Sequence, residues 1–352
     1  MNYLLGYEIM PFKILLIVAA FIAGVIFDCF SGKKKSKVRD VLYNGTIVYL
    51  LFKIGFIGGG ELVNQQWHAV FFQSIITIVV ASFWTLLVFV LLKRWSSFEP
   101  ITQISIATHF GSVSIGTFIA SMAFLDALHI AVDSTVVVWL SIMEFPAIFI
   151  GLWKLGVRAK TLLSIIKEKW VLAILPLSII LGLLFGNSVS IVVKTVFFEQ
   201  LFVPILLYFL FEMGYKAADS LLSLKKNIKS VVFTGIFIPI LGAVFGSSVG
   251  FLMGCGMGGV FVMAILMASA SYVLAPLCMY EVLKGIYKTD GEVAKQVVST
   301  SLALSVGVTL PFNILVGFEL YYIFIKALFA WPLLAFIGLG LVLALGVVSI
   351  RH

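Results

Sequence analysis

Two apolar stretches of the chain carry unusually many glycine, serine and threonine residues for segments at membrane depth. The first runs from Ala107 to Leu125 and the second from Met267 to Val282, and within them Ser269 follows Ser112 by 157 positions. Small and hydroxyl-bearing residues allow a transmembrane helix to be interrupted inside the membrane. Two such stretches at matched positions therefore predict the two halves of one binding site.

An interrupted helix offers ligands that need no charged side chain. Its free backbone N–H groups carry about half a positive charge and can hold an anion, while hydroxyl and carbonyl oxygens suit a hard cation. In the alternative reading, the small residues only allow helices to pack closely, but their recurrence at equivalent positions favours a site. We expect the substrate anion to contact a set of glycine, hydroxyl and phenol residues: Gly111, Ser112, Ser114, Thr117, Ser269, Ser271 and Tyr272.

Ionisable and polar side chains at membrane depth are candidates for binding a coupling ion, because burying them is costly. Glu144 is the best placed, in the sequence MEFP just before a helix-distorting proline. It could coordinate a cation or carry a proton; alternatively, a neighbouring helix satisfies the carboxyl group, or the group lies close to an interface. The expected ligands of a coupling ion, which includes sodium, are Glu144, Ser114, Ser271, Thr309 and Asn313.

Three further ionisable residues lie within apolar segments. His109 precedes the first expected break and is either a proton relay or a hydrogen-bonded structural residue. Lys53 and Glu212 occupy equivalent positions in two related segments and have opposite charges, which predicts a gate or a structural pair. The sequence contains no GxxxxGK[ST], HExxH or CxxC motif, so ATP-driven transport and metal catalysis have no support. The cysteines lack paired or metal-type spacing, which favours packing roles for all three: Cys29, Cys255 and Cys278.

The composition indicates a membrane protein. Of 352 residues, 62% are hydrophobic and 11% are charged, against about 25% charged residues in soluble domains. Apolar runs of about 20 residues recur, as helices that cross the bilayer require, and the absence of strand alternation excludes an outer-membrane barrel. The first run has no cleavage site and is expected to be a retained span. We predict an all-α polytopic membrane protein with eleven spans: Pro11 to Phe30, Asp40 to Gly59, His68 to Leu92, Pro100 to Leu128, Ser134 to Gly156, Trp170 to Val189, Thr195 to Ala217, Ser230 to Met253, Met257 to Leu283, Ala294 to Tyr321 and Ile325 to Ile350.

Basic residues predict the orientation of these spans. Nineteen of the 24 Lys and Arg residues fall in the loops after the odd-numbered spans, whereas the opposite loops carry Lys194 and Lys326. By the positive-inside rule, the N-terminus is extracytoplasmic and the C-terminus is cytoplasmic. The same asymmetry explains the formal net charge of +8 without a nucleic-acid partner. We expect a multi-pass protein of the cell (inner) membrane, with the lipid bilayer as its partner.

Three sequence landmarks recur in the same order in the two halves of the chain. Leu51 to Leu62 aligns with Leu210 to Leu221, the paired serines align, and Leu140 to Gly151 aligns with Ser305 to Gly317, at offsets of 159, 157 and 165 residues. Each unit holds five spans, so the second copy must enter the membrane in the opposite orientation. Inverted repeats of this kind form transporters with broken helices and a substrate site at the midplane. The predicted units are residues 1–160 and 161–322, followed by one additional helix in residues 323–352.

Several of these motifs occur in an order that is typical of one family. They are KIG…GG from Lys53 to Gly59, FGSVSIGT from Phe110 to Thr117, a carboxylate-x-Pro from Glu144 to Pro146, MGGV and Ser-x-Ser in the ninth span, and a proline in the tenth. In this the chain resembles the sodium-dependent bicarbonate permease family, over ten spans from Pro11 to about Tyr321. The resemblance implies core and gate bundles, a homo-oligomer that is a trimer, and sodium-coupled uptake of bicarbonate. In some members it also implies a PII-like cytosolic regulator, although the short loop between spans five and six weakens that expectation here.

The match to the family's motifs is incomplete. Tyr272 stands where the family has an Asp directly after the ninth-span serines, Ile115 stands where a Gly is expected, and MEFP replaces MDIP. Loss of a carboxylate removes a strong ligand from a cation site, and a phenol narrows or reshapes an anion pocket. The departures leave the anion and the coupling ion open. The positions that match the family's fourth-span and ninth-span motifs are Gly111, Ser112, Ser114, Thr117, Ser269 and Ser271.

Three classes of function remain. The first is a secondary active transporter of a small anion. It would couple bicarbonate uptake to sodium, or it would couple another small anion, such as a carboxylate, to protons or sodium. The second is a passive channel, which would show neither saturation nor accumulation, and the sequence offers no ring of filter residues. A membrane enzyme or scaffold is third; it would need an acid/base or nucleophile cluster near a membrane face, which the sequence lacks. We therefore expect no catalytic residues and no cofactor beyond a bound sodium ion.

Overall fold

The computed structural model describes residues 12–31, 37–157, 171–190, 193–222, 228–287 and 291–351. Within these ranges the chain is helical and contains no strand, which confirms the predicted all-α polytopic class. Seven helical segments are long and apolar enough to cross a membrane: Lys37–Leu62, Trp67–Trp95, Pro100–Ala127, Val136–Lys154, Thr195–Ala218, Lys229–Leu252 and Glu292–Ala330. Four shorter apolar helices lie within the other predicted spans: Leu15–Asp28, Ile174–Phe185, Met257–Ala268 and Leu333–Ser349. The predicted boundary at Tyr321 and Ile325 is wrong, because the helical segment of the tenth span continues to Ala330 and the last helix begins at Leu333.

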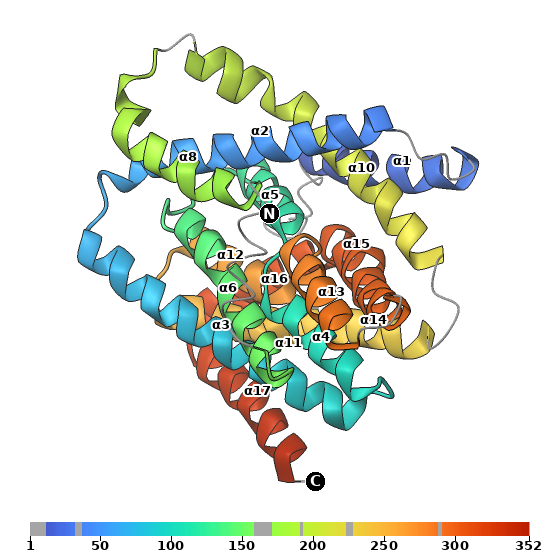
Figure 1. The fold of residues 1–352 in the computed structure, drawn as a ribbon. Helices are drawn as coiled ribbons and strands as arrows, with labels where there is room; N and C mark the ends of the chain where they lie inside the picture. The colour runs from blue at the N-terminus through green and yellow to red at the C-terminus, as the bar shows by residue number, and fades with distance from the viewer. Residues whose placement is uncertain are drawn as a thin grey trace, which may run out of the picture.

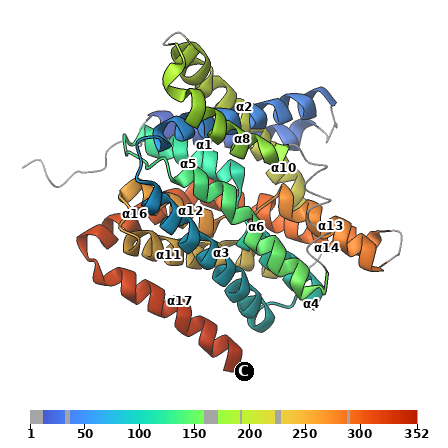
Figure 2. The same cartoon turned by 60° about the vertical axis from the view of Figure 1, so that its left-hand side comes forward.

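Four helices lie together along one side of the molecule, and we call them the four-helix bundle (Figure 1). They are α1 (Phe12–Ser31), α2 (Lys37–Leu62), α8 (Val171–Phe185) and α10 (Phe202–Leu222). Within the bundle α2 packs along α8, α1 packs along α10, and α2 also contacts α10. In a second view the same four helices again lie together in the upper part of the molecule (Figure 2).

The remaining helices form a second group, which we call the broken-helix bundle. In it α3 packs on α4 and α6, while α11 packs on α12 and on a π-helical segment, η3. The last helix, α17, lies at the lower edge of the molecule against α11 and α3 (Figure 2). The bounds are α3 (Trp67–Trp95), α4 (Pro100–Gly111), α5 (Ile115–Ala127), α6 (Val136–Lys154), α11 (Ile228–Leu252), α12 (Met257–Ala268), α13 (Leu274–Tyr287), α14 (Glu292–Leu302), η3 (Ala303–Thr309), α15 (Leu310–Phe312), η4 (Asn313–Gly317), α16 (Phe318–Ala330) and α17 (Leu333–Arg351).

Glycines set the close approach of helices in the four-helix bundle. A Cβ atom added at Gly55 or Gly59 of α2 would overlap atoms of α8, and one added at Gly214 of α10 would overlap the Phe21 carbonyl of α1. Gly55 and Gly214 are aligned with each other in the sequence landmarks. Both aligned glycines therefore lie where two helices cross at short distance.

Gly59→Ala is expected to lower the thermal stability of the protein. The added methyl group would overlap the backbone carbonyl of Ile179, and overpacking of this kind costs about 1–3 kcal/mol. The matched control is Gly45→Ala in the same helix, where the added Cβ meets no atom within 4 Å. Thermal unfolding in detergent should give a lower midpoint for Gly59→Ala only; equal midpoints would contradict the close packing of α2 on α8.

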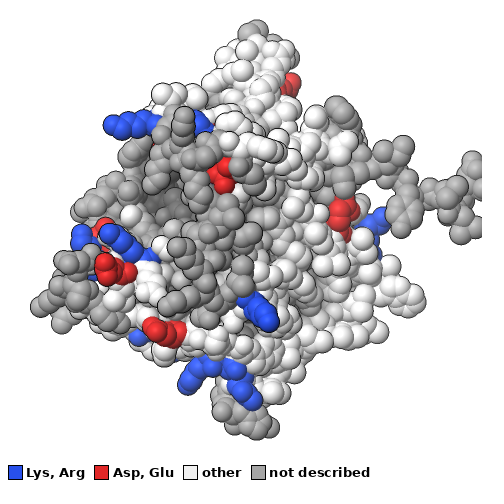
Figure 3. Space-filling view, turned by 90° about the vertical axis from the view of Figure 1, so that its right-hand side faces the viewer, with Lys and Arg blue, Asp and Glu red and all other residues white. Residues whose placement is uncertain are grey.

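Polar contacts join several helix ends at one end of the molecule. Arg39 at the start of α2 donates from Nε and Nη2 to the two carboxylate oxygens of Glu212 in α10, at 2.9 and 3.0 Å. The Ser97 and Ser230 hydroxyls, 3.0 Å apart, join the segment after α3 to the start of α11. Figure 3 views this end, with Lys and Arg side chains spread around it. The loop that bears on PII-type regulation includes residues 158–170, which lie outside the described residues.

Two of the cysteines predicted to be packing residues can be located. Cys255 and Cys278 are both free and buried. Cys255 lies in the turn between α11 and α12, where burial raises the pKa of its thiol to about 12. The thiol is therefore protonated and unreactive at neutral pH. The side chain of Cys29 lies outside the described residues.

Candidate functional site

The first break lies between α4 and α5, in the first serine-rich stretch. After Gly111 the chain turns extended at Ser112, with φ −92° and ψ 167°. Ser114 then caps α5, because its Oγ accepts hydrogen bonds from the Thr117 N–H at 3.1 Å and the Thr117 hydroxyl at 2.8 Å. Serine suits this position since its oxygen satisfies an amide that the helix leaves free. Residues 112–114 thus separate two half-helices, and all three are buried.

The second break lies between α12 and α13, at the other serine pair. Ser269 follows α12 with φ −94° and ψ 166°, which is nearly the conformation of Ser112. Ser271 Oγ accepts a hydrogen bond from the Ala275 N–H in the first turn of α13, at 3.4 Å. Both helices are therefore interrupted at the serines where the sequence predicts it.

The two breaks lie against each other and share hydrogen bonds. The Ser114 N–H donates to Ser269 Oγ at 3.0 Å, and the Ser271 N–H donates to the His109 carbonyl at 2.7 Å. The partners come from opposite halves of the chain. We call this meeting point of four half-helices the crossing. It brings together the glycine, hydroxyl and phenol residues that the sequence singles out.

Tyr272 extends from the second break to the start of α5. Its hydroxyl accepts a hydrogen bond from the Gly116 N–H at 3.0 Å and donates to Met213 Sδ in α10 at 3.3 Å. A Cβ atom at Gly116 would overlap this hydroxyl. Tyr43 of α2 also donates to Met213 Sδ, at 3.6 Å, and its ring stacks on Phe209 with centroids 5.9 Å apart. The crossing therefore contacts the four-helix bundle through Tyr272.

Three buried polar atoms at or near the crossing have no hydrogen-bond partner among the described residues. They are Ser112 Oγ, His109 Nε2 and Glu144 Oε1. The other imidazole nitrogen, His109 Nδ1, lies 2.7 Å from the Ser105 carbonyl oxygen. Buried polar groups normally have a partner, so each such atom calls for one. The hydroxyl and carboxylate oxygens among them are of the kind that suits a hard cation.

Glu144 lies in α6, close to the second break. Its side chain is buried and is within electrostatic range of both Tyr272 and Cys278. Pro146 lies inside the same helix and lacks the N–H that would bind the Ile142 carbonyl. A carboxylate and a carbonyl oxygen in one helical turn can both serve as ligands for a cation.

Two other predicted coupling-ion residues have hydroxyl or amide groups already engaged. Asn313 Nδ2 donates to the Ala268 carbonyl at 2.9 Å and its Oδ1 accepts from the Tyr321 hydroxyl at 2.9 Å. Thr309 donates to the Gly235 carbonyl of α11 at 2.9 Å. Asn313 thus caps the carboxyl end of α12, and Thr309 ties η3 to α11. The structure brings Glu144, Ser114 and Ser271 to one region, but it directs the Thr309 hydroxyl elsewhere.

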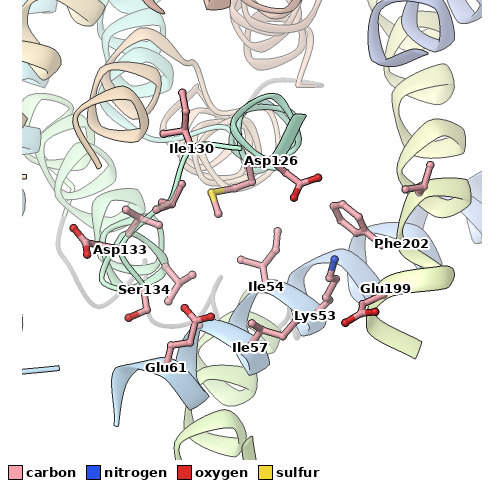
Figure 4. Close-up of a pocket in the computed structure, with 16 residues that line it drawn as sticks. Lys53, Ile54, Ile57, Glu61, Asp126, Ile130, Asp133, Ser134, Glu199 and Phe202 are labelled. Atoms are coloured by element: carbon pink, nitrogen blue, oxygen red, sulfur yellow. The ribbon is translucent and has the colours of Figure 1, made fainter. Parts of the chain in front are cut away.

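A cavity of about 470 Å³ opens between the two bundles (Figure 4). Its walls come from α2, α5, α6, α10, the turn before α6, and a π-helical segment, η2 (Lys194–Gln200). Met122 lines it, six residues after Gly116 on α5, which is about 9 Å along a helix. The cavity therefore approaches the crossing along α5. Its charged lining residues are Lys53, Glu61, Asp126, Asp133 and Glu199.

Lys53 lies at the wall of this cavity and does not pair with Glu212. Its Nζ is 3.1 Å from the centre of the Phe202 ring, and it lies within electrostatic range of Asp126 and Glu199. Figure 4 shows Lys53 beside Phe202 and Glu199. Glu212 instead pairs with Arg39. The predicted pairing of Lys53 with Glu212 is therefore wrong.

The sequence alone did not indicate several residues that hold the crossing in position. Trp84 Nε1 donates to the Phe110 carbonyl at the end of α4, at 3.2 Å, and Tyr321 orients Asn313. A buried Trp or Tyr needs a partner for its polar atom, which was the available signal. The sequence pattern does not single out Met213, since a methionine in an apolar span is expected to be a packing residue.

Comparison with known families agrees with this architecture. The family model for the Na+-dependent bicarbonate transporter superfamily matches residues 17–326, a range that includes both breaks and the cavity. Among curated proteins none matches the chain significantly. The family match and the apolar helices together show that this is a membrane protein that functions in ion transport. The chain belongs to the Na+-dependent bicarbonate transporter superfamily.

Proposed function

We propose that the protein is a secondary active transporter that carries bicarbonate into the cell together with sodium. The observation that carries this proposal is the crossing, where the amino ends of α5 and α13 meet inside a family-matched region. Helix amino ends attract anions through their free amides and dipoles. Glu144 supplies a buried carboxylate for the accompanying cation.

We also propose the inverted repeat, with units 1–160 and 161–322 and an additional helix in 323–352. Matched contacts support it: α2 packs on α8 as α10 packs on α1. The nearly equal backbone angles of Ser112 and Ser269 support it as well. The assembly as a trimer and a PII-like regulator stay predictions that rest on the family resemblance.

The proposed orientation makes the cavity between the bundles an extracytoplasmic vestibule. The N-terminus is then extracytoplasmic and the basic helix ends that include Arg39 and Lys93 are cytoplasmic. Four carboxylates and one ammonium line the vestibule, and clefts lined by one sign of charge concentrate the opposite ion. The vestibule accordingly favours sodium, with Lys53 as its cationic contact for an anion.

Sodium-driven bicarbonate uptake is the expected result in proteoliposomes. Uptake of labelled bicarbonate should saturate with concentration and rise at least several-fold under an inward sodium gradient. Measurements at fixed pH with potassium in place of sodium, and with an inward proton gradient, serve as the comparison. Uptake driven by a proton gradient alone would show that protons, and not sodium, are the coupling ion. No uptake under any gradient would reject bicarbonate as the substrate.

A further inference from the structure

The amino end of α5 is already occupied by side chains of the protein. The Ser114 N–H donates to Ser269 Oγ at 3.0 Å, the Gly116 N–H to the Tyr272 hydroxyl at 3.0 Å, and the Thr117 N–H to Ser114 Oγ at 3.1 Å. A helix leaves its first four amides free for ligands. Of the first four amides of α5, those of Gly116 and Thr117 therefore donate to side-chain oxygens. Ser114 and Ser269 hold the two breaks together, whereas the acceptor of the Gly116 N–H is the phenol hydroxyl of Tyr272.

The amino end of α13 is held less tightly. Its first turn has the Ala275 N–H directed at Ser271 Oγ over the longer distance of 3.4 Å, and Pro276 in the same turn has no N–H to donate. Ser112 Oγ, in the opposite break, is fully buried and unpaired among the described residues. The two halves of the crossing thus differ, and Tyr272 is the residue that makes the difference at α5.

Tyr272 is held by contacts that a bound anion would replace. Its hydroxyl is the acceptor for Gly116 and the donor to Met213 Sδ, both neutral interactions. Hydrogen bonds from an amide to an ion are roughly twice as strong as those between neutral groups. An anion at this amide would therefore compete with the phenol for the Gly116 N–H.

Displacing the phenol would also break a contact between the two bundles. Met213 belongs to α10 and is shared by the hydroxyls of Tyr272 and Tyr43. Tyr272 comes from the second break of the broken-helix bundle, whereas Tyr43 comes from α2 of the four-helix bundle. Release of Tyr272 from Gly116 and release of this inter-bundle contact are thus one event.

On the basis of the proposed function, we propose that the Tyr272 hydroxyl occupies the anion position at the amino end of α5 and that substrate must displace it. Tyr272 is then the residue that sets which anions are accepted. Small planar anions reach the Gly116 amide as the phenol swings out, whereas larger ones find the phenol ring in their way. The ring limits size, and the hydroxyl competes for the amide.

The test compares Tyr272→Phe and Tyr272→Ala with the native protein in anion uptake and in anion-dependent thermal stabilisation. Tyr272→Phe should lower the half-saturating bicarbonate concentration about three- to tenfold in both measurements, because the competing hydroxyl is lost. Tyr272→Ala should also accept acetate, with uptake at least fivefold above native. Tyr322→Phe is the matched control, since that ring packs on Phe124 with centroids 6.1 Å apart.

Two results would overturn the proposal. A higher half-saturating concentration in Tyr272→Phe would show that the hydroxyl is a substrate ligand. Unchanged half-saturating concentrations in both variants would show that Tyr272 does not select the anion. If the native protein shows no bicarbonate uptake, the proposed function fails; stabilisation by bicarbonate, formate, acetate and nitrate then still tests Tyr272. Stabilisation that is stronger in Tyr272→Phe than in the native protein supports its role, and none in any variant rejects it.

A stability measurement checks the contact independently of transport. Gly116→Ala should lower the unfolding midpoint of the native protein, because the added Cβ would overlap the Tyr272 hydroxyl. The same change should cost less in a Tyr272→Ala background, where the phenol is absent. Equal losses in both backgrounds would show that the phenol does not rest on Gly116, and would overturn the proposal.

Discussion

Ser269→Ala is expected to reduce the initial rate of anion uptake about 10- to 100-fold. The change removes the oxygen that accepts the Ser114 N–H at 3.0 Å and releases the Leu266 carbonyl, to which Ser269 Oγ also donates. A buried donor left without a partner costs about 1–3 kcal/mol, and each 1.4 kcal/mol corresponds to a factor of ten. The two half-helices would then lose their direct link through Ser269. Proteoliposome uptake at subsaturating bicarbonate measures the effect.

Ser121→Ala is the matched control for this prediction. Ser121 is a fully buried serine of α5 whose hydroxyl donates to the Phe118 carbonyl of its own helix at 2.7 Å. Ser121→Ala also removes a buried serine hydroxyl, but this hydroxyl lies outside both breaks. Uptake in Ser121→Ala should stay within twofold of native, and equal losses in the two variants would show that the effect is general destabilisation.

Glu144→Gln is expected to abolish the stimulation of uptake by the coupling ion. The amide has nearly the shape of the carboxylate but cannot offset the charge of a buried cation, whose desolvation is costly. Uptake with an inward sodium gradient should therefore fall to the level without a gradient, so that the several-fold stimulation expected of the native protein is lost. The measurement is the ratio of initial rates with sodium and with potassium outside.

Glu144→Asp is the control, because it keeps the charge and shortens the side chain by one methylene. It should retain part of the sodium stimulation with a higher half-saturating sodium concentration. Sodium stimulation that survives in Glu144→Gln would remove Glu144 from the cation site. If the native protein responds to protons only, the same pair of variants tests Glu144 as a proton carrier, and unchanged proton-driven uptake in Glu144→Gln would reject that role.

The positions of the breaks could be predicted from the sequence because the cause is local. Serine at a helix start caps free amides, so paired serines in an apolar run mark where a helix stops and restarts. The extended conformations of Ser112 and Ser269 agree with that prediction. The positions of the spans could likewise be predicted from the sequence, since about 20 apolar residues are needed to cross a bilayer.

Long-range partners could not be predicted in the same way. Lys53 and Glu212 are matched in the repeat and opposite in charge, yet Glu212 pairs with Arg39, which lies at the start of α2. The choice depends on how α2 and α10 lie against each other, and close glycine contacts fix α2 against α8 and α10 against α1. The hydroxyl of Thr309 goes to Gly235 for a similar reason, because a π-helical segment changes the face that each residue presents.

The most direct test of the account is whether bicarbonate binds at the crossing. Thermal unfolding of the purified protein would be followed at constant pH and sodium concentration while bicarbonate replaces chloride. A ligand that binds only the folded state at 100 times its Kd stabilises it by about 2.7 kcal/mol. We expect a saturable rise in the midpoint for the native protein and for Ser121→Ala, and none for Ser114→Ala combined with Ser269→Ala. An equal rise in the double variant would contradict the crossing as the anion site.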